Sequence, residues 1–154
     1  VYGSDLLRAR ETAELLGDSI GELPTEFEPA WRERALGLYQ GLTREDIEAR
    51  FPEFGLNEAA YEAIEATPEG GESLRTVEAR VTDRFEELAN GSDEEILVVT
   101  HGGPLCILLG YVKGMGLTES LTDHHLDNCA IAEFEPDGGG MAVVAEDRSV
   151  PKQP

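Results

Sequence analysis

The chain has 154 residues, which is enough for one domain with a single core. It carries 32 acidic and 12 basic residues, and the resulting net charge of -20 opposes binding to nucleic acid or to anionic membranes. Only Lys113 and Lys152 are lysines, and an acidic, lysine-poor surface favours a protein that works in high salt. No stretch of the sequence approaches the length of a membrane span.

The two cysteines favour a reduced, cytoplasmic setting. Cys106 lies in an apolar run and Cys129 in a candidate strand, so both are expected to be small core residues and not a disulfide pair. No charged and then apolar signal segment opens the chain. Because the first residue is Val1 and not methionine, we expect further sequence before it.

The first part of the chain predicts one helix followed by an irregular segment. Apolar residues at helical spacing predict a helix over about 5–16, with Ser4 as its cap and Gly17 at its end. Residues 18–42 contain two prolines and several glycines and are expected to be irregular.

Two short helices are expected next. Thr43 and Asp46 have the spacing of a capping box, which predicts a helix that ends near Arg50. A second helix is expected over 56–66, before a Thr-Pro-Glu-Gly-Gly run breaks the pattern.

The strongest helical pattern begins after Ser73, which is expected to cap it. Apolar residues then recur at helical spacing as far as Leu88, and Asn90 and Gly91 end the helix. The last part of the chain predicts a hairpin formed by residues 129–135 and 141–146, with a glycine-rich turn between them and a frayed tail after it.

The most informative feature is a strand that leads directly into a histidine. Residues 96–100 are uncharged and rich in β-branched types, which predicts a strand buried on both faces. His101 then lies at its carboxyl end, where open α/β sheets place their chemistry. Gly102 and Gly103 allow a tight turn, and Pro104 suits the first position of a helix whose free amides attract an anion.

Other candidate residues have ordinary explanations on spacing alone. Arg8, near the start of a helix, would suit a bound anion there, but spacing alone favours an exposed cation paired with Asp5 or Glu11. Glu33 lies between two arginines in an irregular segment, which favours a surface ion pair. Adjacent His124 and His125 would point to opposite faces of an extended segment, which disfavours a metal site there.

Four sequence blocks taken together resemble the histidine phosphatase superfamily, also called phosphoglycerate mutase-like. They occur in the family's order across nearly the whole chain, at residues 4–13, 33–41, 70–73 and 98–102, with Asn-Cys-Ala-Ile following at 128–131. The resemblance implies one α/β domain over residues 1–154. Its expected fold is a three-layer sandwich, with a mostly parallel sheet and helices on both faces.

One block of the family is missing. Members normally open with a strand that ends in Arg-His-Gly, whose histidine accepts the phosphoryl group, and this sequence begins downstream of that position. A fragment is the preferred explanation, and a catalytically silent relative is the second. Because the family's missing strand is central in the sheet, the chain alone is expected to be weakly stable or to aggregate. A cooperative, high-temperature melting transition of a soluble monomer would contradict that expectation.

The resemblance implies a role for each candidate residue. Arg8 matches the family's phosphate-pocket arginine, and His101 matches the histidine that donates hydrogen bonds to the transferring group, with Gly102 beside it. Glu33 matches the proton donor to the leaving oxygen. Ser73 matches the end of a family block, although helix capping also explains it. The implied chemistry needs no metal or other cofactor and acts on a small phosphorylated metabolite.

Three functions remain open from the sequence. The segment 41–70 is short and lacks the paired arginines and longer insertion of cofactor-dependent mutases, which favours a phosphatase over a phosphoglycerate mutase. A third interpretation is a binding module in which Arg8 and His101 hold a phosphorylated partner without turnover. No motif specifies the substrate or the oligomeric state.

Overall fold

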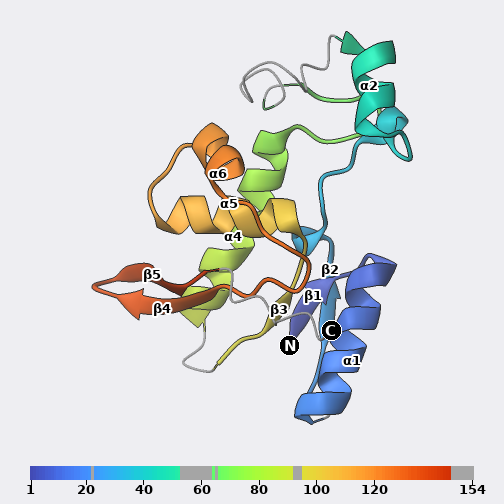
Figure 1. Ribbon diagram of the computed structural model, residues 1–154. Coiled ribbons are helices and arrows are strands. Elements are labelled where there is room, and N and C mark those ends of the chain that lie inside the picture. Colours follow the sequence, from blue (N-terminus) through green and yellow to red (C-terminus); the bar gives the residue numbers. More distant parts are fainter. Residues whose placement is uncertain (22, 53–63, 65, 92–94, 147–154) are drawn as a thin grey trace, which may run out of the picture.

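The computed structural model describes residues 1–21, 23–52, 64, 66–91 and 95–146 (Figure 1). In chain order the elements are β1 (Tyr2–Ser4), α1 (Leu7–Ile20), β2 (Glu26–Glu28), the 3₁₀ turns η1 (Pro29–Trp31) and η2 (Gly37–Tyr39), α2 (Arg44–Arg50), α4 (Leu74–Gly91), β3 (Val98–Val99), α5 (Gly102–Val112), α6 (Leu117–Asp123), β4 (Glu133–Asp137) and β5 (Gly140–Ala145). The helix expected over 56–66 falls outside the described residues except for Ile64 and Ala66, and the tail after Arg148 also lies outside them.

Three short strands form a parallel sheet in the order β2-β1-β3. Tyr2 lies opposite Glu26 on one side and Val98 on the other. Neither β1 nor β2 was predicted, because three residues are too few to show a strand pattern in the sequence. All three carboxyl ends point the same way, toward η1 and the start of α5 (Figure 1).

Helices cover both faces of this sheet, as the resemblance implies. On one face, Val99 and Phe27 pack against Ala9 and Ala13 of α1. On the other face, Tyr2 and Val98 contact the largest core cluster, which contains apolar side chains of η1, α4, α5 and α6: Trp31, Val77, Val81, Ile107, Leu108 and Leu117. Successive residues of a strand point to opposite faces, so β3 contributes Val98 to one cluster and Val99 to the other.

The predicted bounds of the first helix were wrong at both ends. Ser4 belongs to β1, and α1 begins at Leu7 with Leu6 as its N-cap. The helix also continues through Gly17 as far as Ile20, and it ends before Gly21, which has a φ of 100°. A glycine inside a helix costs only about 1 kcal/mol relative to alanine, so Gly17 did not stop the helix.

The two other capped helices are confirmed. Thr43 and Asp46 form the expected capping box at the start of α2, which ends at Arg50. At the start of α4, the Ser73 hydroxyl accepts a hydrogen bond from the Thr76 amide at 3.1 Å.

The strand expected over 96–100 is shorter than predicted. Only Val98 and Val99 form β3, and the side chain of Leu97 is exposed, so burial on both faces was wrong for this residue. Within the described residues, β3 pairs with β1 alone. The edge of β3 that faces away from β1 therefore lacks a strand partner in that part of the chain.

The predicted hairpin is present as a separate two-stranded sheet. Strands β4 and β5 pair antiparallel, with Asp137 opposite Gly140 at the turn. The first strand begins at Glu133, later than predicted, so Cys129 lies outside it. Cys129 is exposed with a φ of 65°, which corrects its assignment to the core, whereas Cys106 is buried as expected and both cysteines are free.

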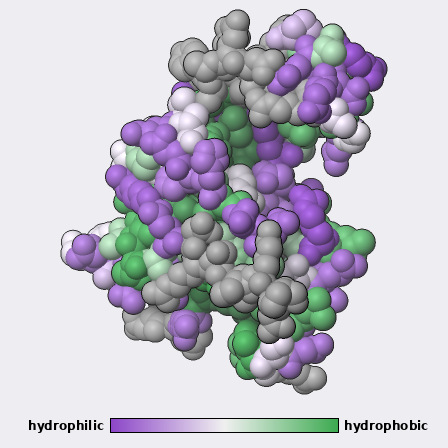
Figure 2. All heavy atoms as spheres, viewed as in Figure 1, coloured by the Kyte–Doolittle hydropathy of each residue, from purple (hydrophilic) through white to green (hydrophobic). Residues whose placement is uncertain are grey.

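Hydrophilic residues dominate the face of the molecule in Figure 2, and apolar side chains reach the surface between them. The exposed apolar residues include Leu7, Leu15 and Ile20 of α1. Among the helices in the described ranges, none combines the length and apolar composition needed to cross a bilayer.

Candidate active site

His101 lies where its sequence context predicted, between the end of β3 and the start of α5. Its Nε2 is 2.8 Å from the hydroxyl oxygen of Ser4, the last residue of β1. Partial burial lowers the pKa of His101 below 6.5, the charges of Arg8 and Arg80 lower it further, and Glu33 opposes them. The charges of Arg8 and Glu33 thus both act on this imidazole.

Glu33 lies in the segment between η1 and η2, and its carboxylate reaches the start of α5 next to His101. Its Oε2 accepts a hydrogen bond from the Gly103 amide at 3.2 Å, and its Oε1 accepts one from the Arg34 amide at 2.9 Å. The Gly103 amide belongs to the first turn of α5, where backbone N–H groups have no partner within the helix. A carboxylate therefore occupies the helix start that the sequence assigned to an anion.

Gly103, and not Gly102, lies directly against the Glu33 carboxylate. A Cβ on Gly103 would overlap Glu33 Oε1, whereas a Cβ on Gly102 would meet no atom within 4 Å. The helix also begins at Gly102, two residues before Pro104, so Pro104 is not its first residue. The role of Gly102 in binding phosphate stays a prediction.

The arginines beside Glu33 use their side chains elsewhere. Arg32 donates two hydrogen bonds to Asp5, at 2.5 and 2.6 Å. Arg34 donates to the carbonyl oxygens of Glu72 and Ala66, at 2.8 and 2.7 Å. Asp5, one of the two carboxylates that could have paired with Arg8, is therefore engaged by Arg32, whose hydrogen bond lowers the pKa of Asp5.

Arg8 is the second residue of α1, near the helix start as predicted, and its side chain is exposed. No acidic residue lies in that first turn. Within the described residues Arg8 forms no ion pair, so the carboxylate partner expected on spacing is absent there.

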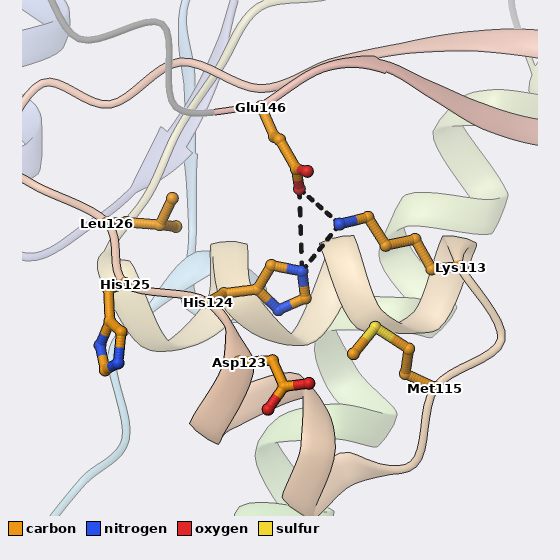
Figure 3. A pocket seen from close by; sticks show the side chains of 7 residues that line it. All are labelled: Lys113, Met115, Asp123, His124, His125, Leu126 and Glu146. Carbon is orange, nitrogen blue, oxygen red and sulfur yellow. Dashed lines mark hydrogen bonds and ion pairs between the residues drawn. The ribbon is translucent and has the colours of Figure 1, made fainter.

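The two other histidines lie apart from this group, near the end of α6. His124 Nδ1 is 2.8 Å from the Ser120 carbonyl oxygen, and its Nε2 is 3.0 Å from Lys113 Nζ. Lys113 also pairs with Glu146, while His125 points away from them (Figure 3). The described residues contain no group of three or more histidine, cysteine, aspartate or glutamate side chains placed to hold a metal ion.

Sequence reasoning missed three residues at the site. Ser4 contacts His101, Gly103 contacts Glu33, and Arg80 of α4 donates to the backbone of the Glu33 segment at 3.4 Å. Arg80 is one of several arginines on its helix, and no sequence pattern separates it from the others.

The fold and the site together define an α/β protein with a candidate anion site at the carboxyl ends of parallel strands. The chain belongs to the histidine phosphatase superfamily, since residues 1–147 match the model of that family's branch 1.

Three comparisons show which members it is similar to. A glucosyl-3-phosphoglycerate phosphatase of Mycolicibacterium vanbaalenii is 34% identical over 123 residues, covering 75% of this chain and 53% of the relative. A 2,3-bisphosphoglycerate-dependent phosphoglycerate mutase of Rhizobium meliloti is 34% identical over 111 residues, covering 68% of this chain and 51% of the relative. The solved structure of a mycobacterial glucosyl-3-phosphoglycerate phosphatase with inorganic phosphate matches with a TM-score of 0.78 and 26% identity, covering 97% of this chain and 76% of that one.

The chain thus spans about half the length of these curated relatives.

Proposed function

We propose that this chain forms the larger part of the active site of a phosphomonoester hydrolase that works through a phosphohistidine intermediate. The observation that carries the proposal is the position of the Glu33 carboxylate on the Gly103 amide, two residues after His101 at the carboxyl end of β3, and the charge of Arg8 acting on the same imidazole supports it. Family membership and the relatives that are phosphatases support it.

The reaction has two displacements at one phosphorus atom. A histidine nitrogen attacks phosphorus, the phosphorus–nitrogen bond forms, and the ester bond breaks as the leaving oxygen takes a proton from Glu33. Water then attacks the phosphohistidine and gives a proton to the Glu33 carboxylate, which releases phosphate and restores both residues. Arg8, His101 and Gly102 bind the equatorial oxygens, where their fixed donors stabilise the developing charge.

The accepting histidine is proposed to come from a segment outside these 154 residues. None of the three histidines of the chain stands in an Arg-His-Gly sequence. Two features of the described residues support this proposal: β3 has no strand partner on its edge away from β1, and β4 and β5 form a separate sheet.

Two other functions remain as alternatives. Phosphoglycerate mutase activity is favoured by the relative from Rhizobium meliloti, but the short segment between Gly41 and Gly70 favours hydrolysis. A phosphate-binding module without turnover would use the same Arg8 and His101. The proposed substrate in each case is a small phosphorylated metabolite.

Hydrolysis of p-nitrophenyl phosphate tests the proposal. The 154-residue chain is expected to be inactive, and a version extended upstream with its native sequence is expected to be active. His101→Ala is the control in both versions. Activity of the short chain that survives His101→Ala would overturn the site. An extended protein that binds phosphate without turnover would favour the binding module.

We also propose a cytoplasmic protein adapted to high salt. The net charge of -20 and the two free cysteines support this setting. Thermal unfolding in a salt series tests it, since the acidic chain should lose stability as salt is withdrawn.

A further inference from the structure

Arg80, on α4, contacts the backbone of residues 30–35, the segment that carries Glu33. Its Nη1 donates to the Ala30 carbonyl oxygen at 2.8 Å, and its Nη2 lies 3.4 Å from the Glu33 carbonyl oxygen. The same guanidinium donates to both carboxylate oxygens of Glu72, from Nε at 2.9 Å and from Nη2 at 3.1 Å. Four hydrogen bonds to the protein thus engage a group that has five N–H donors.

Glu72 hydrogen-bonds to Ala35, at the other end of this segment. Its Oε2 accepts a hydrogen bond from the Ala35 amide at 3.0 Å, and its own amide donates to the Ala35 carbonyl oxygen at 2.9 Å. Arg34 donates to the Glu72 carbonyl oxygen from the same side. Residues 30–35 are therefore bound on both sides of Glu33 by one pair of charged residues.

The backbone next to this pair is closely packed. A Cβ on Gly71 would lie 2.5 Å from the Ala35 carbonyl oxygen, and a Cβ on Gly37 would overlap the backbone of residues 69–71. Leu38 N–H donates to the Glu69 carbonyl oxygen at 3.0 Å. The Glu33 segment thus has little freedom to move relative to the start of α4.

The Arg80–Glu72 pair is partly shielded from solvent, with side chains 19% and 24% exposed. Burial alone would raise the pKa of Glu72, but the hydrogen bonds from Arg80 and the Ala35 amide lower it overall, so the carboxylate stays charged at neutral pH. Charge-assisted, two-point contacts of this kind fix geometry more strongly than a single neutral hydrogen bond.

We propose that Arg80 and Glu72 are positioning residues that hold the Glu33 carboxyl group at the leaving oxygen of the substrate. The inference rests on the proposed function, in which Glu33 is the proton donor. The four protein acceptors of Arg80 favour this role over direct binding of phosphate.

The choice of leaving group can separate proton donation from general stability. p-Nitrophenolate is a weak base and leaves without a proton, whereas an alkoxide leaves only if it is protonated. A misplaced donor should therefore slow the hydrolysis of an alkyl phosphate such as glycerol phosphate far more than that of p-nitrophenyl phosphate.

The experiment uses the protein extended upstream and compares kcat for both substrates. In Arg80→Met and Glu72→Gln, the ratio of alkyl to aryl kcat should fall by about tenfold or more, approaching the loss in Glu33→Gln, since general acid catalysis contributes about 10²- to 10⁴-fold. Arg80→Lys, which keeps the charge but not the planar fork, should fall between Arg80→Met and the parent protein.

Arg84→Met is the matched control. Arg84 lies on the same helix and binds Glu28 with two hydrogen bonds at 2.6 and 2.8 Å, but in the described part of the chain it does not hydrogen-bond to residues 30–35. Its loss should lower Tm and leave the substrate ratio unchanged.

The outcomes distinguish the inference from the function beneath it. Equal loss for both substrates in Arg80→Met and Glu72→Gln, as for Arg84→Met, would overturn the positioning role while the phosphatase stands. If Glu33→Gln itself leaves the ratio unchanged, or the extended protein hydrolyses neither ester, the proposed function fails and the inference fails with it. Glu72→Gln and Arg80→Lys decide the question if Arg80→Met does not fold.

Discussion

His101 and His124 are two partly enclosed imidazoles beside charged side chains, and their hydrogen bonds differ. His124 Nδ1 must donate to the Ser120 carbonyl oxygen, so its Nε2 accepts from Lys113, and both nitrogens are used within the chain. In the described residues His101 has a side-chain partner only at Nε2. Charge and burial alone therefore do not distinguish the two histidines, whereas a ring nitrogen without a side-chain partner, at the ends of parallel strands, distinguishes His101.

The largest expected effect separates the two histidines by activity. In the upstream-extended protein, His101→Ala should lower kcat for p-nitrophenyl phosphate by about 10²- to 10³-fold, because the proposed mechanism loses a donor to the transferring group. His124→Ala should leave kcat nearly unchanged. Steady-state kinetics of both variants would contradict the comparison if the two losses were equal.

Alanine substitutions at two neighbouring glycines, Gly103 and Gly102, test whether the contact with Glu33 matters for activity. Gly103→Ala should lower kcat by up to about 10²-fold, because the added Cβ displaces the Glu33 carboxylate by a fraction of an ångström or more. A Cβ on Gly102 would enter open space, so Gly102→Ala should change kcat far less. Equal kinetics for the two variants would show that the Gly103 contact is unimportant.

The loss of stability should be larger for the His124 variant than for the His101 variant, the reverse of their effects on activity. His124→Ala removes partners from the Ser120 carbonyl oxygen and from Lys113, and it should lower the free energy of unfolding by about 1–3 kcal/mol. His101→Ala should cost less, since His101 contacts one hydroxyl group. Urea unfolding of both variants measures the two costs, and a greater cost at His101 would break the comparison.

The smallest expected effect is on the titration of His101. Its pKa is lower in the folded chain than the value of 6.5 that applies to the unfolded chain. At a pH between the folded and the unfolded pKa, the unfolded chain binds more protons, so the free energy of unfolding rises with pH. Bound phosphate should raise this pKa, because a dianion favours imidazolium. NMR titration of the ring with and without phosphate measures the change, and an unchanged midpoint would argue against phosphate binding beside His101.

The sequence predicted those parts of the structure that have local signatures. The Thr43 capping box and the helix after Ser73 were found because each depends on side chains a few residues apart. The position of His101 followed from a strand-to-helix change within a few residues. The short strands β1 and β2 were missed because their stability comes from partners far along the chain.

The sequence pointed to Glu33, His101 and Arg8 as candidate residues, but not to the residues that contact them in the fold. Glu33 and Arg8 were singled out only through the family resemblance, since spacing alone favoured surface ion pairs. Asp5 pairs with Arg32, and Gly103 with Glu33, across long stretches of sequence. Such pairs are set by the tertiary fold, which no local pattern encodes.

The pairing of β1 with β3 has a consequence for how the protein folds. Ser4 and His101 are 97 positions apart, and β1 cannot pair with β3, which precedes His101, until the chain has been synthesised beyond that strand. Contacts of such high sequence separation slow folding, because a long loop loses its entropy before the contact forms. The imidazole and its hydroxyl partner should therefore come together late, after the α4 and α5 helices have formed.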